Sequence, residues 1–269
     1  HRLFRPVAGG PAMKIGDILQ RVAALVFVLV MLSPLILVVL FAFSSKAISN
    51  FPIPGWTLRW FREMIAFEPF GPALTNSLLV GVSVGIISAI IGTMAALGLA
   101  CLPRRDAQVA MVALALPLML PPLFLAVMLL VWFLFLGLSL GLKTVVLAHL
   151  LFTLPFVVIV VYARLSSFDF RTVEAARDLG ASPMRAFADA MLPAIRPVVI
   201  GAALMAVALS IDDFILTSFT IGGGNTLPIL VMSTLRTSVT PMTNAIGTML
   251  ITLSIASTLT ALYLTRYRG

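Results

Sequence analysis

Six long apolar stretches constrain this chain more than any other feature. Each is long enough to cross a hydrocarbon core of about 30 Å as a helix, which takes about 20 residues. Hydrophobic residues make up 61% of the chain and charged residues 10%, whereas a soluble domain carries about 25% charged residues. We therefore expect an all-α membrane protein surrounded by lipid, with six transmembrane helices at about residues 23–43, 74–102, 107–136, 144–163, 194–221 and 244–265.

Two of these spans contain signals for a break. The cluster Pro117, Pro121 and Pro122 predicts a kink or break in the third span, and Asp212 and Asp213 interrupt the fifth. Proline is tolerated in a membrane helix where neighbouring groups satisfy the freed carbonyls. We assign residues 13–269 to one transmembrane domain, and we interpret residues 1–12 as a remnant of a tag, a linker or an upstream reading frame.

The Lys and Arg residues predict the orientation. Thirteen of the 18 fall on the side of the chain termini and five on the other. Because cytoplasmic loops are richer in Lys and Arg, both termini and the loop between spans four and five are expected in the cytoplasm. The net charge of +8 then comes from Lys and Arg residues at the ends of the spans. These residues form no basic run, so we expect no nucleic-acid partner.

The two longer loops on the opposite side have their own signals. The segment 44–72 contains Trp56 and Trp60, which are typical of anchors at the membrane interface and are also suited to receiving a docked protein. The segment 222–242 begins with three glycines that allow a turn, and residues 228–238 are expected to form a short re-entrant or surface helix.

A polar segment at residues 168–193 lies between spans four and five. Asp169 is suited to cap a first helix, Gly180 to end it in a left-handed turn, and Ser182-Pro183 to begin a second short helix. The segment cannot lie in lipid, because it carries Arg171, Glu174, Arg177, Asp178, Arg185 and Asp189. It is therefore expected to form a helical hairpin in water, with residues suited to docking on another protein.

The spacing within this segment is specific. Glu174-Ala175-Ala176, Gly180 and Leu192-Pro193 resemble the EAA loop of type I ABC importer permeases, with Ala190 where that family prefers Ile. The resemblance implies coupling helices that sit in a cleft of a cytoplasmic ATPase, with this role assigned to Glu174, Ala175, Ala176, Asp178, Gly180, Leu192 and Pro193. The alternative is an ordinary amphipathic hairpin that only connects two spans.

The sequence offers no catalytic or metal site. A phosphate-binding loop needs Gly-Lys followed by Ser or Thr, and the segment 141–144 has Leu142 where that glycine is required. ATP and Mg are therefore expected on separate ATPase subunits, with no cofactor in this chain. Cys101 is a single cysteine, and His149 stands alone in an apolar span, where we expect a packed or capped side chain rather than a ligand or base.

Asp212 and Asp213 are the remaining signal. An Asp at the centre of a membrane helix costs at least ~2.5 kcal/mol. Sixteen residues separate Arg196 from Asp212, which places Asp212 about 24 Å along the span, in its outer half. One hypothesis is that the carboxylates attract a cationic substrate, and the other is that they hold a bend by accepting backbone N–H bonds. No charged partner within the chain is evident from the sequence.

A narrower resemblance rests on this stretch. Residues 210–214, Ser-Ile-Asp-Asp-Phe, together with Leu227-Pro228 and Asn244-Ala245, look like the second permease subunit of spermidine/putrescine importers. The resemblance implies a bacterial inner-membrane subunit that forms half of a polyamine pathway, working with a second homologous permease, two ATPase subunits and an external substrate-binding protein. The pathway residues would be Ser210, Asp212, Asp213 and Phe214.

Three alternatives to a polyamine permease remain open. The first is a permease of the same family for another small solute, such as an amino-acid derivative or an opine. The second is a non-transporting membrane assembly protein whose hairpin recruits a partner. The third is an ion-driven carrier that uses the two carboxylates as an ion site.

Overall fold

The computed structural model describes residues 15–47, 51–237 and 240–266, and this part of the chain is almost entirely helical. The predicted remnant at residues 1–12 lies outside the described residues. Seven longer helices account for the predicted spans, namely α1 (Ile15–Ala42), α3 (Phe70–Ala100), α4 (Arg104–Met119), α5 (Pro122–Phe135), α6 (Leu142–Leu165), α9 (Leu192–Asp212) and α12 (Pro241–Arg266). The shorter elements are α2 (Arg59–Ala66), α7 (Arg171–Asp178), α8 (Pro183–Ala186), the π-helix η1 (Phe187–Met191), α10 (Ile215–Thr220) and α11 (Leu227–Thr237).

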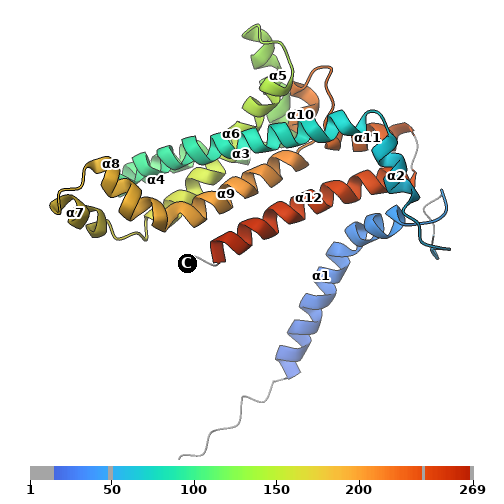
Figure 1. Ribbon diagram of the computed structural model, residues 1–269, viewed down its shortest axis with the longest axis horizontal. Helices are drawn as coiled ribbons and strands as arrows, with labels where there is room; N and C mark the ends of the chain where they lie inside the picture. Colours follow the sequence, from blue (N-terminus) through green and yellow to red (C-terminus); the bar gives the residue numbers. More distant parts are fainter. Residues whose placement is uncertain (1–14, 48–50, 238–239, 267–269) are drawn as a thin grey trace, which may run out of the picture.

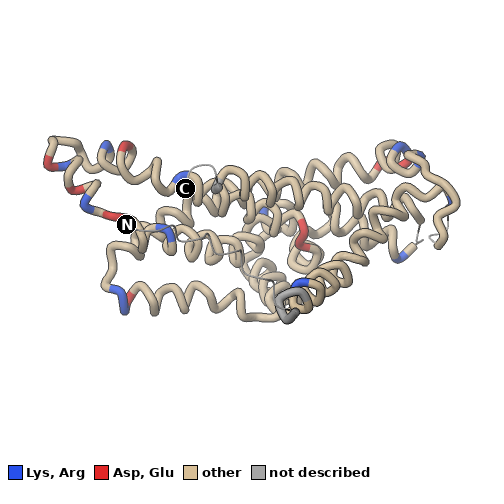
Figure 2. The backbone as a smooth tube through the Cα atoms, turned by 90° about the horizontal axis from the view of Figure 1, so that it is seen from below, with Lys and Arg blue, Asp and Glu red and all other residues tan. Residues whose placement is uncertain are grey.

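The long helices α3, α6, α9 and α12 run side by side and form the body of the molecule (Figure 1). The C-terminal end of α1 meets α12, and the rest of α1 slants away from the bundle (Figure 1), so that residues 19–37 are exposed within this chain. Most Lys, Arg, Asp and Glu residues lie towards the two ends of the long axis (Figure 2). This distribution is the one expected of a bundle whose middle is surrounded by lipid.

The third predicted span is broken, as its prolines indicate. Helices α4 and α5 meet at an angle of 96°, because the residue before a proline is disfavoured in the α region and Leu120 and Pro121 accordingly have extended backbones. Five described helices are long and apolar enough to cross a membrane, and six spans result when the α4–α5 pair is counted as one.

Glycines allow α3 to pack closely on its neighbours. A Cβ atom built on Gly85 would lie 2.4 Å from Val207 Cγ2 of α9, and one on Gly92 would lie 2.8 Å from Val157 Cγ1 of α6. Small residues at such positions favour helix association in membranes, where packing replaces the hydrophobic effect as the driving force. The central position of α3 therefore depends on residues without side chains.

In the loop at residues 44–72, one of the two tryptophans predicted as interfacial anchors is buried instead. Trp56 is exposed, as an interfacial anchor would be, but Trp60 is buried in a cluster with Ala42, Met64 and Phe70. Its indole Nε1–H donates to the carbonyl of Ser44 (2.6 Å), so the ring can be buried without leaving a polar group unsatisfied. Trp60 therefore connects the first span to α2 rather than anchoring the loop in lipid headgroups.

The loop that begins at Gly222 agrees more closely with its prediction. Gly222 has a positive φ of 68° and turns the chain back, and α11 occupies most of the range in which a short helix is predicted. Asn225 and Leu227 fix this loop on α3, because Asn76 Nδ2 donates to the carbonyl of Asn225 and Leu227 N–H donates to Ser77 Oγ, each at 2.8 Å.

We predict that Gly85→Leu lowers the midpoint of thermal unfolding in detergent by roughly 3–10 °C, because overpacking a close contact costs about 1–3 kcal/mol. Gly98→Leu is the matched control on the same helix, since a Cβ there meets nothing within 4 Å. Equal midpoints for the two variants would contradict the close packing of α3 on α9.

Candidate functional site

The hairpin at residues 168–193 begins as its sequence indicates. Arg171 N–H donates to Asp169 Oδ1 (3.0 Å) at the start of α7. At its end, Gly180 has a φ of 89°. The N–H groups of Gly180 and Ala181 donate to the carbonyls of Arg177 (2.9 Å) and Ala176 (3.0 Å). This pair of bonds is a Schellman motif, which needs a left-handed residue that glycine adopts without strain.

The second helix of the hairpin differs from the expectation of a separate short helix. Ser182 Oγ accepts from Arg185 N–H (3.4 Å) as the predicted N-cap, but the chain then continues as one helical run, Pro183–Asp212, into the fifth span. Pro193 has no N–H to give, and the preceding turn adopts π geometry, with Leu192 N–H donating to the carbonyl of Phe187. Such a π turn lets a helix absorb an irregularity without ending.

The hairpin is exposed at its tip and anchored at its base. Glu174, Ala175, Asp178 and Gly180 are exposed, as are Leu192 and Pro193, and Ala176 is half-buried. The tip also presents two large apolar side chains, Leu179 at 89% exposure and Met184 at 75%. Exposed apolar side chains surrounded by polar groups are typical of protein-docking surfaces, and the motif had not drawn attention to these two residues.

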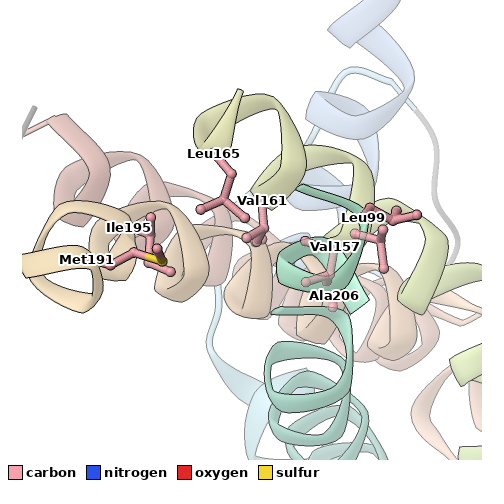
Figure 3. Packing of buried hydrophobic residues seen from close by; sticks show 10 residues of the cluster. Leu99, Val157, Val161, Leu165, Met191, Ile195 and Ala206 are labelled. Carbon is pink, nitrogen blue, oxygen red and sulfur yellow. The ribbon is translucent and has the colours of Figure 1, made fainter. Parts of the chain in front are cut away.

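The base of the hairpin packs into the bundle through one apolar cluster. Met191 and Ile195 lie beside Leu165 and Val161 of α6 (Figure 3), and Phe168, Val173 and Phe187 of the hairpin pack against the same cluster. Interiors packed in this way are stiff. A displacement of the hairpin would therefore reach α6 and α9 directly.

The fifth span breaks at the two carboxylates. Helix α9 ends at Asp212, Asp213 is extended with ψ at 118°, and α10 starts two residues later. Asp213 Oδ2 accepts from Thr217 N–H (3.0 Å), and Thr217 Oγ1 donates to the Asp213 carbonyl (2.9 Å). Asp213 thus holds the break by accepting a backbone N–H, which is the structural hypothesis stated for it above.

Asp212 has a different partner. Its Oδ1 accepts from Ser254 Oγ of α12 (2.7 Å), so the two carboxylates are held by different helices. Both nevertheless line one hollow of about 320 Å³, whose other walls are Pro117, Leu118, Leu120, Pro122, Leu125, Phe152, Leu209 and Leu216. The break in the fifth span therefore faces the break in the third across a mostly apolar space.

The other two predicted pathway residues do not join this hollow. Ser210 is buried, with its Oγ 2.7 Å from His149 Nδ1. Phe214 lines a separate, apolar hollow near α11 and α12, together with Pro228 and Met232. The four residues lie within five consecutive positions but are divided among three environments, because successive side chains at a helix end point in different directions.

His149 is packed and capped, as predicted, and it lies beside one of the two carboxylates, a neighbour that was not evident from the sequence. His149 Nε2 lies 3.3 Å from Asp213 Oδ2 and 3.0 Å from Thr217 Oγ1. The predicted depth of the two residues was compatible with this pair. On the predicted topology, His149 lies about 7.5 Å from the outer end of span four and Asp213 about 12 Å from the outer end of span five, so both lie in the outer half of the membrane.

The remaining candidate motifs are structural in this fold. The segment that comes nearest to a phosphate-binding loop forms the start of α6, where Gly141 N–H donates to Thr144 Oγ1 (2.8 Å). Within the described ranges, no three His, Cys, Asp or Glu side chains form a group that could hold a metal ion.

Comparison with known proteins identifies the class. The family of binding-protein-dependent transport system inner membrane components matches residues 81–267. The spermidine/putrescine transport system permease protein PotC of Haemophilus influenzae is 32% identical over 213 residues, covering 79% of this chain and 83% of PotC. The putrescine transport system permease protein PotI of Escherichia coli strain K12 is 34% identical over 228 residues, covering 81% of this chain and 80% of PotI.

Solved structures share the fold at low sequence identity. The chain matches a bacterial ABC transporter involved in the import of alginate, an acidic polysaccharide, with a TM-score of 0.67 and 14% identity, covering 92% of this chain and 94% of that one. It also matches the MetNI methionine ABC transporter, with a TM-score of 0.56 and 18% identity, covering 75% and 99% of the two chains. This chain belongs to the family of inner membrane components of binding-protein-dependent transport systems.

We predict that Gly180→Val leaves membrane insertion intact but weakens binding of the ATPase, or its transport-linked hydrolysis, by about tenfold. A β-branched residue at a φ of 89° is strained by about 1–3 kcal/mol. The measurement is co-purification of the complex together with its stimulated ATPase rate. Gly180→Asn is the matched control, because Asn tolerates this conformation, and wild-type coupling in the valine variant would refute the prediction.

Proposed function

We propose that this chain forms half of the translocation pathway for a small organic cation, a polyamine such as spermidine or putrescine, in an ATP-driven importer. The observation that supports this most is the hollow shared by Asp212 and Asp213, in which two carboxylates adjoin a mostly apolar wall. A polyamine carries ammonium groups separated by methylene chains, so it needs both kinds of surface.

The electrostatics of the hollow favour a cation. Asp212 and Asp213 lie side by side at a helix break in a membrane span, and the described residues that line the hollow with them are uncharged. Carboxylates that face a water-filled path within a membrane stabilise cations and repel free anions. The names of PotC and PotI agree with this chemistry. The shared fold alone would not indicate a cationic substrate, because a transporter of an acidic polysaccharide has the same architecture.

The hairpin suits coupling to an ATPase. In this proposal the α7–α8 end faces the cytoplasm, and Glu174, Ala175, Ala176, Asp178, Gly180, Leu192 and Pro193 form or support the surface that enters a cleft of the ATPase. The apolar tip residues Leu179 and Met184 add buried area at that contact. ATP and Mg are then bound by two partner ATPase subunits, and this chain itself hydrolyses nothing.

Two further partners complete the proposed importer. A second, homologous permease would supply the other half of the pathway, as the resemblance to the polyamine permeases PotC and PotI implies. An external binding protein would deliver the substrate, in keeping with the family of binding-protein-dependent systems.

We expect Asp212→Asn and Asp213→Asn each to lower polyamine uptake by about tenfold in reconstituted liposomes, because a lost carboxylate raises the barrier to the cation by roughly 1.4 kcal/mol or more. Asp106→Asn is the control, since Asp106 lies in the first turn of α4 and away from the hollow.

The uptake assay also separates the alternatives. Recovery of the complex with its ATPase is measured in the same samples. Full uptake by both single variants and the double variant would overturn the cationic pathway. Loss of the complex would favour a purely structural role, and uptake of an amino-acid derivative in place of polyamine would support a different substrate in the same family.

The orientation has its own test. Cys101, which is exposed, is first replaced by Ser, and a new cysteine is placed at Ala181 in the hairpin. A membrane-impermeant thiol reagent is expected to label Ala181→Cys in inside-out vesicles and not in intact cells with a permeabilised outer membrane. Labelling from the outside only would reverse the proposed topology.

A further inference from the structure

A buried polar network lies next to Asp213 and joins three helices. His149 of α6, Ser210 of α9 and Thr217 of α10 are each less than 5% exposed. His149 Nδ1 lies 2.7 Å from Ser210 Oγ, and Nε2 lies 3.0 Å from Thr217 Oγ1. Both ring nitrogens thus have a hydroxyl partner, one on each side of the break in the fifth span.

One tautomer of a neutral His149 satisfies all of these groups. When the Thr217 hydroxyl donates to the Asp213 carbonyl at 2.9 Å, Thr217 Oγ1 can accept from His149 Nε2–H, and Nδ1 can accept from Ser210 Oγ–H. His149 Nε2 also lies 3.3 Å from Asp213 Oδ2.

This arrangement orients one carboxylate. Asp213 Oδ2 is held by Thr217 N–H (3.0 Å) on the side of α10 and approached by His149 Nε2 on the side of α6. The Asp213 side chain is 15% exposed and lines the hollow. Both contacts use Oδ2, so neither of them occupies Oδ1.

The ring itself has little freedom to move. It lies 5.6 Å from the Phe152 ring in a tilted arrangement, and it is almost completely buried. Burying a polar ring in an apolar span costs free energy unless both of its nitrogens have hydrogen-bond partners. Here the partners are Ser210 and Thr217, which lie on the two sides of the break in the fifth span.

We propose that His149 is a positioning residue for substrate passage, which bridges α6 to the α9–α10 break and thereby holds the Asp213 carboxylate towards the hollow. This inference rests on the proposed pathway role of Asp213. It assigns no proton transfer to His149 and no contact with the substrate.

The test uses the complete importer, reconstituted with its partner permease, ATPase subunits and polyamine-loaded binding protein. His149→Phe keeps an aromatic ring of similar size and removes both nitrogens. We expect its maximal uptake rate to fall about threefold to tenfold. The concentration of loaded binding protein that gives half the maximal rate should stay unchanged, because it reports docking outside the membrane.

Two further variants separate positioning from general stability. His149→Gln retains an N–H donor for Thr217 and is expected to recover most of the rate. Thr153→Val is the matched control on the same helix. Its hydroxyl contacts the His149 carbonyl and Ser88 Oγ, each at 2.9 Å, and not the carboxylate. We expect it to shift the unfolding midpoint without changing the ratio of uptake to assembled complex.

The decisive measurement is a double-mutant cycle with Asp213→Asn. If His149 acts through Asp213, adding His149→Phe to Asp213→Asn lowers the rate no further, whereas independent effects multiply. Multiplied effects, or a wild-type maximal rate in His149→Phe, would overturn the positioning role while leaving the pathway proposal in place. Wild-type uptake in Asp213→Asn would instead overturn the pathway role of this carboxylate, and the positioning role with it.

Discussion

In a hydrocarbon environment, backbone and side-chain polar groups must find their hydrogen-bond partners inside the protein, because lipid offers none. The break in the fifth span concentrates this requirement at one place. Ending α9 at Asp212 frees carbonyl and N–H groups, and Asp213 with Thr217 satisfies part of them across the break. His149 and Ser210 extend the same network into α6 and α9. The position of α10, and with it one wall of the hollow, depends on these bonds.

The hollow exists because two spans break at similar depth for different reasons. In the third span, consecutive prolines exclude helical geometry before them, and α4 and α5 diverge by 96°. In the fifth span, a carboxylate takes over the role of the missing helical bonds. Residues beside both breaks line the hollow, so its shape depends on both of them.

The same bundle connects this hollow to the hairpin. Helix α9 runs without interruption from the hairpin to Asp212, and its first turns share an apolar cluster with α6 (Figure 3). Helix α3, whose glycines lie against α6 and α9, supports both. A rigid element that reaches from the proposed docking surface to the proposed pathway would be a physical basis for coupling between them.

The sequence by itself determined the elements of this protein. Long apolar runs allowed only membrane helices, the prolines located the break after Pro117, and Gly180 and Ser182 located the turn and cap of the hairpin, because these signals depend on residues close together in the chain. Tertiary structure alone decided which side chains meet. It paired Asp213 with His149, 64 positions away, buried Trp60, separated Phe214 from its neighbours, and joined the hairpin to the fifth span through a π turn. Those outcomes depend on the depth, rotation and packing of helices against one another, which a local pattern does not contain.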